Sequence, residues 1–259
     1  MELPAEIRNM IYTYTLSDAS GINLVGAFKH KRRTVERVSA AAQDGISTSY
    51  SCYTYSKIND DVRAAYAEPT ALVPALLAVN KQIHQESRDM LYANDFIFAD
   101  SFALYSFMLN LGPSGAKSLK SVRIMNWGYG RALKAYNHSC FAVLAWATNI
   151  KKLVLDKLPG YSRNPNGAAE QLYRDAFPWL EAIGVAKGKV DAGLDVLELG
   201  DEALADNYYS TTQSRVVTDA DRVDKFHERL GVLLGAQRKR VMAKPIKKRK
   251  IVKGVVDEL

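Results

Sequence analysis

The stretch SCFAVLAWATNIKKLVL, residues 139–155, indicates how this chain is built. The part up to Asn149 has apolar residues at helical spacing. The last six residues, IKKLVL, form a short apolar run that is typical of a buried strand. The stretch therefore predicts a helix over 139–149 followed directly by a strand over 150–155.

Two other segments repeat this order. A helix over 101–111 precedes LKSVRI (119–124), and a helix over 168–184 precedes LDVLEL (194–199). All three strands carry apolar residues at positions one, four and six, a pattern that resembles the strand segment of a leucine-rich repeat. Their spacings of 31 and 44 residues are irregular, so an ordinary α/β layer explains the pattern equally well. Both readings predict an α/β (or α+β) fold with parallel strands joined by helical crossovers.

Two amphipathic helices are expected in the first hundred residues. The segment LPAEIRNMIYTYTL (3–16) has apolar residues three and four apart, and so has a second segment over 74–92. FIF (96–98) then reads as a buried strand. The apolar positions of the two helices are Leu3, Ile7, Met10, Ile11 and Tyr14 in the first, and Leu76, Val79, Ile83, Ser87, Met90 and Leu91 in the second.

The remaining segments complete a three-part organisation. Residues 17–70 are polar and weakly periodic, and we interpret them as an insertion of short strands and loop within an N-terminal region over 1–100. A helix–strand region over 101–235 follows, and its last helix is expected over 219–235 with Gly235 ending it. Residues 236–259 are rich in lysine and are predicted to form a disordered tail.

Composition excludes some protein classes. The 47% apolar and 24% charged shares are ordinary for a globular protein, and no run of about 18 apolar residues predicts a membrane span. The N-terminal segment carries acidic residues where a secretory signal would be basic and then apolar. Only two cysteines occur, which is typical of a reducing compartment. The expected location is therefore nuclear or cytoplasmic.

The net charge of +7 comes from the C-terminal tail. Residues 238–253 hold nine Lys or Arg and no acid, and without them the chain has a net charge of −2. The clusters resemble nuclear-import signals read by an import carrier, but they could also contact nucleic-acid phosphates or be a solvated tail without a partner. The residues concerned are Arg238, Lys239, Arg240, Lys247, Lys248, Arg249 and Lys250.

No sequence motif assembles a catalytic or metal site. The four histidines lack zinc-site spacing, and neither a phosphate-binding glycine loop nor a GxSxG motif occurs. His138-Ser139-Cys140 places three reactive residue types together, but neighbours in sequence do not face one another and no third member of a triad is evident. We therefore expect a protein that is not an enzyme and binds no cofactor and no metal.

The two N-terminal helices carry a family resemblance. LPAEIRNMIYTYTL resembles the first helix of an F-box, and ALLAVNKQIHQESRDMLYANDFIF (75–98) resembles a later F-box helix. Together they look like F-box-like proteins of filamentous fungi, in which a variable insertion separates these helices and irregular helix–strand repeats follow. Because the motif begins at residue 3, a longer natural N-terminus is expected.

The resemblance implies a substrate receptor of a cullin-RING ubiquitin ligase. Its helices would bind the ligase adaptor, and the region 101–235 would recruit an unknown client. The residues implied in adaptor binding are Leu3, Pro4, Ile7, Ile11, Tyr14, Leu76, Val79 and Ile83. A purely structural reading has the stripe of the first helix packing on the helix over 75–92 and on the strand over 96–98. The alternative function is a nuclear binding protein whose tail contacts nucleic acid or acidic partners.

Overall fold

The computed structural model describes residues 3–48, 67–127, 130–158, 164–201, 203–204 and 219–241. Helices and strands alternate along most of this length, which confirms the predicted α/β class. The helices are α1 (Ala5–Leu16), α2 (Ala40–Thr48), α4 (Lys81–Tyr92), α5 (Ser101–Ala116), α6 (Gly130–Leu144), α7 (Pro165–Lys187) and α8 (Asp219–Val241), with a 3₁₀ helix η1 (Pro74–Ala78). The strands are β1 (Ile22–Lys29), β2 (Arg32–Val38), β3 (Asp95–Asp100), β4 (Ser121–Asn126), β5 (Lys152–Leu155) and β6 (Leu197–Leu199).

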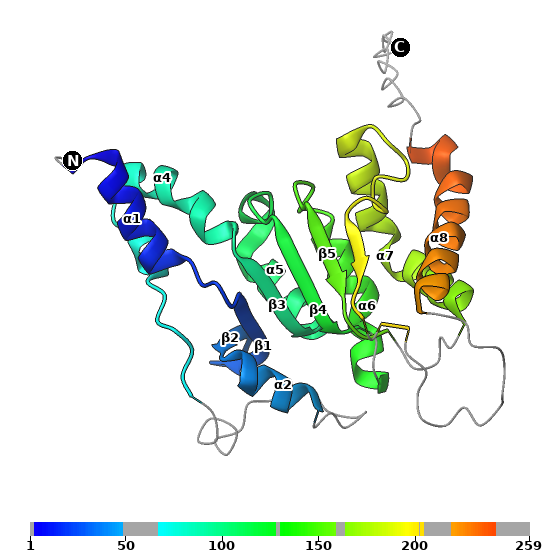
Figure 1. Ribbon diagram of the computed structural model, residues 1–259, viewed down its shortest axis with the longest axis horizontal. Helices are drawn as coiled ribbons and strands as arrows, with labels where there is room; N and C mark the ends of the chain where they lie inside the picture. The colour runs from blue at the N-terminus through cyan, green and yellow to red at the C-terminus, as the bar shows by residue number, and fades with distance from the viewer. Residues whose placement is uncertain are drawn as a thin grey trace, which may run out of the picture.

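The strands form one sheet in the order β2-β1-β3-β4-β5-β6. β1 and β2 are an antiparallel hairpin, and every other pairing is parallel. β1 therefore lies inside the sheet, between β2 and β3, so this part of the expected insertion over 17–70 contributes directly to the fold. The helices α1 and α4 lie beyond one end of the sheet, and α8 lies at the other end (Figure 1).

The apolar positions of the strands align across the sheet. Val122, Leu153 and Leu197 are partners in adjacent strands, and so are Ile124, Leu155 and Leu199. These are positions four and six of the three expected strand segments. Position one of each segment lies just before its strand, where Leu119 and Ile150 are buried and Leu194 is half-buried. The repeated pattern thus sets the register of the parallel strands.

Three helices cover one face of this sheet. The strands β3, β4, β5 and β6 follow one another across the sheet, and right-handed crossovers in one direction place the helices that connect them on the same side. α5, α6 and α7 accordingly pack against the aligned apolar rows, as Figure 1 shows. Phe98, Phe141 and Trp179 are among the largest buried side chains of this core.

The opposite face is covered only in part by described residues. α2 packs beneath β1 and β3, where Val25, Val38, Ala42 and Ala99 form a small cluster. Gln43 on α2 donates to the backbone oxygens of Leu24 and Ile97 at 3.2 and 3.0 Å, which joins the helix to both strands. On β4, β5 and β6 the same face carries charged pairs, including Arg123 with Asp156 at 2.6 Å.

The β1–β2 hairpin turns at two residues with a left-handed backbone. His30 has φ 50° and Lys31 has φ 63°. The strands pair on both sides of this turn, beginning with Lys29 opposite Arg32. In the middle of β1, a Cβ on Gly26 would lie 2.4 Å from the ring of Phe102, so only glycine lets β1 approach α5 this closely.

Three predicted helix boundaries were wrong. The expected helix over 74–92 is divided into η1 and α4, because Asn80 is extended and its side chain caps α4 by accepting from the Ile83 N–H at 2.8 Å. The expected helix over 139–149 is α6, which begins at Gly130 and ends at Leu144. The last helix passes Gly235 and continues to Val241, so residues 236–241 of the expected disordered tail are helical.

A buried asparagine joins the two N-terminal helices to the sheet. The amide nitrogen of Asn94 donates to Leu16 O at the end of α1 and to Leu91 O at the end of α4, at 2.8 and 2.7 Å. The amide oxygen of Asn94 accepts from the Asp18 N–H at 2.8 Å. One side chain therefore satisfies backbone groups from three segments at the point where β3 begins.

Asn94→Ala should destabilise the protein by about 2–3 kcal/mol, because it leaves several buried backbone groups without partners. Urea unfolding followed by circular dichroism measures this loss. Asn9→Ala, on the exposed side of α1, is the control and should change stability by less than about 0.5 kcal/mol. Equal effects of the two substitutions would contradict the role assigned to Asn94.

Candidate functional site

The candidate site is the helix α1 with the part of α4 that holds it. A single carboxylate, Glu86 on α4, makes the polar contacts between the two helices. Arg8 donates to both oxygens of Glu86, at 2.9 and 3.0 Å, and the hydroxyl of Tyr12 donates to it at 3.0 Å. Gln82, one turn earlier on α4, donates to Glu86 at 2.9 Å. We call these four residues the Glu86 cluster.

The hydrogen bonds of the Glu86 cluster favour the ionised carboxylate. The hydrogen bonds from Arg8 and Gln82 are the main reason that the pKa of Glu86 falls from its ordinary value of 4.5 to about 2. Burial and the neighbouring carboxylate raise the pKa of Tyr12, which keeps its phenol protonated as a donor. The cluster is therefore intact at neutral pH.

The cluster decides which side of α1 faces the protein. Arg8, Tyr12 and Leu16 follow one another at four-residue spacing and so share one side of the helix. Tyr12 and Leu16 are buried, and they pack with Ile83 of α4. At 3.6 residues per turn, the apolar stripe that the sequence predicted lies on the other side of the helix.

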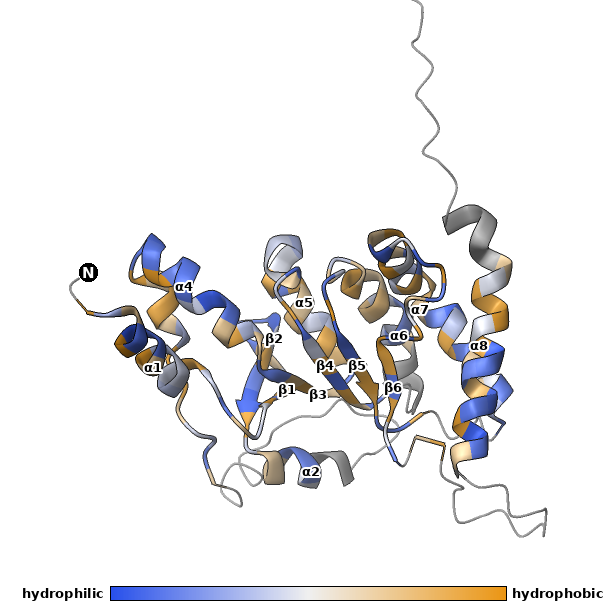
Figure 2. Cartoon of the chain, turned by 45° about the horizontal axis from the view of Figure 1, so that its top comes forward, coloured by the Kyte–Doolittle hydropathy of each residue, from blue (hydrophilic) through white to orange (hydrophobic). Residues whose placement is uncertain are grey.

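That stripe is exposed to solvent. We call it the α1 stripe, and its side chains keep between 40% and 80% of their surface accessible. The structural reading, in which these residues pack on α4 and β3, is therefore wrong. Figure 2 shows the orange, apolar residues along α1. The α1 stripe consists of Leu3 (50%), Ile7 (42%), Met10 (53%), Ile11 (40%) and Tyr14 (80%).

The other predicted adaptor-binding residues lie in different environments. Pro4 is exposed at the start of α1, and Val79 is 63% exposed between η1 and α4. Leu76 is half-buried and packs against the cluster of Tyr12, Leu16 and Ile83. Ile83 is buried and belongs to the core. The structure thus separates the eight predicted residues into six exposed ones and two that hold the helices together.

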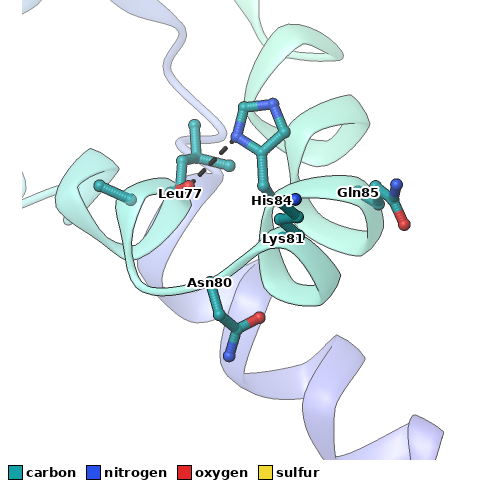
Figure 3. A pocket seen from close by; sticks show the side chains of 6 residues that line it. Leu77, Asn80, Lys81, His84 and Gln85 are labelled. Atoms are coloured by element: carbon teal, nitrogen blue, oxygen red, sulfur yellow. Dashed lines mark hydrogen bonds between the residues drawn. The ribbon is translucent and has the colours of Figure 1, made fainter.

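A shallow depression lies beside the start of α4. Leu77, Ala78, Asn80, Lys81, His84 and Gln85 line it. The Nδ1 of His84 is 3.1 Å from Leu77 O, which ties α4 to η1 across this depression (Figure 3). The hydrogen bond engages His84 in holding two elements together.

The basic residues are placed only in part. Arg238, Lys239 and Arg240 lie in the last turns of α8, and their side chains are outside the described part of the structure. Lys247, Lys248, Arg249 and Lys250 lie outside the described residues altogether. Nuclear import and phosphate binding by these residues stay predictions.

The His138-Ser139-Cys140 segment lies on α6 and has structural contacts. Burial raises the pKa of the Cys140 thiol, and its sulfur donates to Asn137 O at 3.1 Å. A buried neutral thiol is a poor nucleophile. The ring of His138 stacks on Phe177 of α7 with centroids 5.4 Å apart. Within the described residues, no three His, Cys, Asp or Glu side chains are grouped as metal ligands, and no helix is long and apolar enough to cross a bilayer.

Sequence reasoning missed the Glu86 cluster. Arg8 and Glu86 are 78 positions apart, and both lie outside the apolar stripes of their helices. Charged residues outside an apolar stripe are normally solvated, so the pattern itself gave no signal that a charged side would be the packed side. Only the contact between α1 and α4 identifies these residues.

Comparison with known proteins gives one match. A family described as a domain of unknown function (DUF7730) matches residues 1–139, which is more than half of the chain and runs from α1 into α6. No curated protein and no solved structure matches the sequence.

Glu86→Gln should make stability less dependent on pH below 5. The pKa of Glu86 is lower in the folded chain, so its ionised form stabilises the fold above pH 4.5, and this contribution is lost as pH falls from 4.5 towards 2. The difference between the urea midpoints of wild type and variant should therefore be largest at pH 7 and should shrink as pH falls from 4.5 to 3. Asp89→Asn removes an exposed carboxylate from the same helix and should retain the wild-type pH dependence. A constant difference across this range would contradict the assignment.

Proposed function

The chain belongs to the family described as a domain of unknown function (DUF7730), and we propose that it is a non-enzymatic protein-interaction module that captures a partner on the α1 stripe. We infer that this partner is the adaptor subunit of a cullin-RING ubiquitin ligase. The chain would then act as a substrate receptor and bring a client to a ligase whose catalytic groups reside on other subunits. It would promote ubiquitination by holding the client close to the catalytic subunits of the ligase.

The observation that carries this proposal is the direction in which α1 faces. An amphipathic helix of a globular protein normally buries its apolar side. Here the charged cluster of Arg8 and Glu86 faces inward, and the α1 stripe faces outward. Contiguous exposed apolar side chains are typical of a surface that a partner covers. Burial of these side chains by a partner would stabilise the complex by about 25 cal/mol for each Å² of apolar area removed from water.

The geometry of α1 favours recognition of another helix. The α1 stripe follows three- and four-residue spacing, so it forms a narrow apolar ridge along the helix. Such a ridge fits a groove between two partner helices, as in helix-in-groove recognition. α1 is already folded and fixed by the Glu86 cluster, so binding would order few additional residues.

The F-box-like sequence supports the choice of adaptor. Its leucine-proline-x-glutamate-isoleucine start corresponds to Leu3, Pro4, Glu6 and Ile7, and of these the apolar residues are exposed. These are the side chains that the resemblance assigns to adaptor binding. The buried Ile83 supports α1 from below and would act on the adaptor only indirectly.

The client would be recruited by the helix–strand region. On the sheet face opposite α5, α6 and α7, β5 and β6 present Lys152 and Glu198, which pair at 2.7 Å and remain about half exposed. This face lies away from α1 along the sheet, so a client and an adaptor could be held at the same time (Figure 1).

The decisive experiment uses the purified adaptor. Ile7→Asp with Ile11→Asp places two carboxylates in the α1 stripe, and isothermal titration calorimetry should show adaptor binding by the wild-type chain and its loss in the variant. Both residues are exposed, so the change in folding stability should stay within about 0.5 kcal/mol each.

The control variant is Asn9→Asp with Thr13→Asp, which adds the same charge to α1 outside the stripe. It should bind the adaptor as the wild type does. Absence of adaptor binding by a folded wild-type chain would contradict the ligase proposal, and equal loss in the control variant would contradict the role of the α1 stripe.

A further inference from the structure

The tip of the β1–β2 hairpin concentrates positive charge, whereas the chain outside residues 238–253 has a net charge of −2. Lys29, His30, Lys31, Arg32 and Arg33 are consecutive, and all five are exposed. Among the described residues, Lys29, Lys31 and Arg32 form no ion pair, so their charges face solvent. This basic tip is separate in sequence from the C-terminal clusters.

The basic tip is unfavourable for the stability of the hairpin. A two-residue turn with positive φ at both positions strongly prefers Asn-Gly or similar residues, yet His30 and Lys31 occupy it. Lys29 lies directly opposite Arg32, and like charges in this arrangement repel. Charged side chains on the edge strand β2 discourage pairing with other chains, but that role does not require lysine in the turn. Local features that cost stability in this way are typical of functional sites.

Contacts of Arg33 hold the tip in place. The guanidinium of Arg33 lies over the rings of Tyr136 and Phe102, 5.4 and 5.9 Å from their centroids. Asn110 of α5 donates to Arg33 O at 3.0 Å. β2 is thereby fixed to α5 and α6 just beyond the turn, so the cationic side chains project from an anchored backbone.

An exposed aromatic ring lies beside these charges. Phe28 is directly opposite Arg33 in the hairpin and is 51% exposed. The ring of Phe28 stacks on that of Phe102 with centroids 5.6 Å apart, so Phe102 supports Phe28 from within the protein. A cationic tip next to a supported aromatic ring combines phosphate attraction with a surface for base stacking.

We propose that the segment Phe28–Arg33 binds single-stranded nucleic acid, with Lys29, Lys31 and Arg32 contacting phosphates and Phe28 stacking on a base. Charge alone would fit an acidic peptide equally well, and the exposed Phe28 is what favours nucleic acid. This site uses none of the α1 stripe, so it does not depend on the proposed adaptor binding.

The test measures binding of fluorescein-labelled single-stranded 20-mers, one RNA and one DNA, to the full chain by fluorescence anisotropy at 50 and 200 mM salt. The variant His30→Asn, Lys31→Gly, Arg32→Thr removes two full charges while installing the preferred turn. It should raise the Tm and weaken binding on the order of tenfold near 0.1 M salt, and the salt slope should fall by about 1.4. A structural role alone would not move stability and affinity in opposite directions.

Three comparisons complete the experiment. Lys117→Gln with Lys151→Gln removes the same charge from other exposed sites and should retain binding. Phe28→Leu should weaken binding about fivefold or more by removing the stacking surface. The variant Lys247→Gln, Lys248→Gln, Arg249→Gln, Lys250→Gln changes only the C-terminal cluster and should retain the binding that the basic tip provides. The proposal is overturned if the hairpin variant binds like wild type, if polyglutamate displaces the 20-mer as well as polyuridine does, or if neither 20-mer binds the folded chain.

Discussion

Right-handed crossovers between sequential parallel strands are the constraint on which the rest of this structure depends. Because β3, β4, β5 and β6 follow one another across the sheet, the helices that connect them are confined to one face. That face becomes the core, with the aligned rows through Val122 and Ile124 packed under α5, α6 and α7. The other face is left to α2 and to charged residues on the later strands. The terminal helices are then placed at the ends of the sheet rather than over it (Figure 1).

At the N-terminal end, a polar interaction joins α1 to α4 beside the small apolar cluster of Tyr12, Leu16 and Ile83. Glu86 binds Arg8 and Tyr12 together, and these contacts satisfy charges that are partly removed from water. Partly buried pairs of this kind depend on good geometry, and the two parallel hydrogen bonds from Arg8 provide it. The consequence is that the apolar side of α1 is exposed to solvent. Asn94 reinforces this arrangement by fixing where α1 and α4 meet the sheet.

The two proposed binding surfaces differ in their physical basis. The α1 stripe is apolar and would gain from burial, whereas the basic tip is charged and would attract a polyanion over a distance set by salt. Both surfaces stand on rigid supports, the Glu86 cluster in one case and the aromatic group of Phe102 and Tyr136 in the other. A rigid support reduces the entropy lost on binding, so each surface would lose little conformational freedom on binding the partner proposed for it.

The sequence by itself determined the α/β class and the apolar rows of the sheet, because a strand reports burial through local periodicity. Positions four and six of LKSVRI, IKKLVL and LDVLEL are all on the helix-covered face of the strands. The sequence also located α1 and its stripe. It did not identify the side of α1 that packs, because the pattern predicts that the apolar stripe is buried and that Arg8 is exposed to solvent. Only the tertiary structure decided that point, because the partner of Arg8 lies 78 positions away on another helix. The extended Asn80 that divides η1 from α4 was likewise hidden, because a cap becomes visible only where the backbone leaves the helix. The local pattern indicates whether each residue favours burial or solvent. Where two sides of a helix compete for the same contact, long-range contacts decide which side is buried.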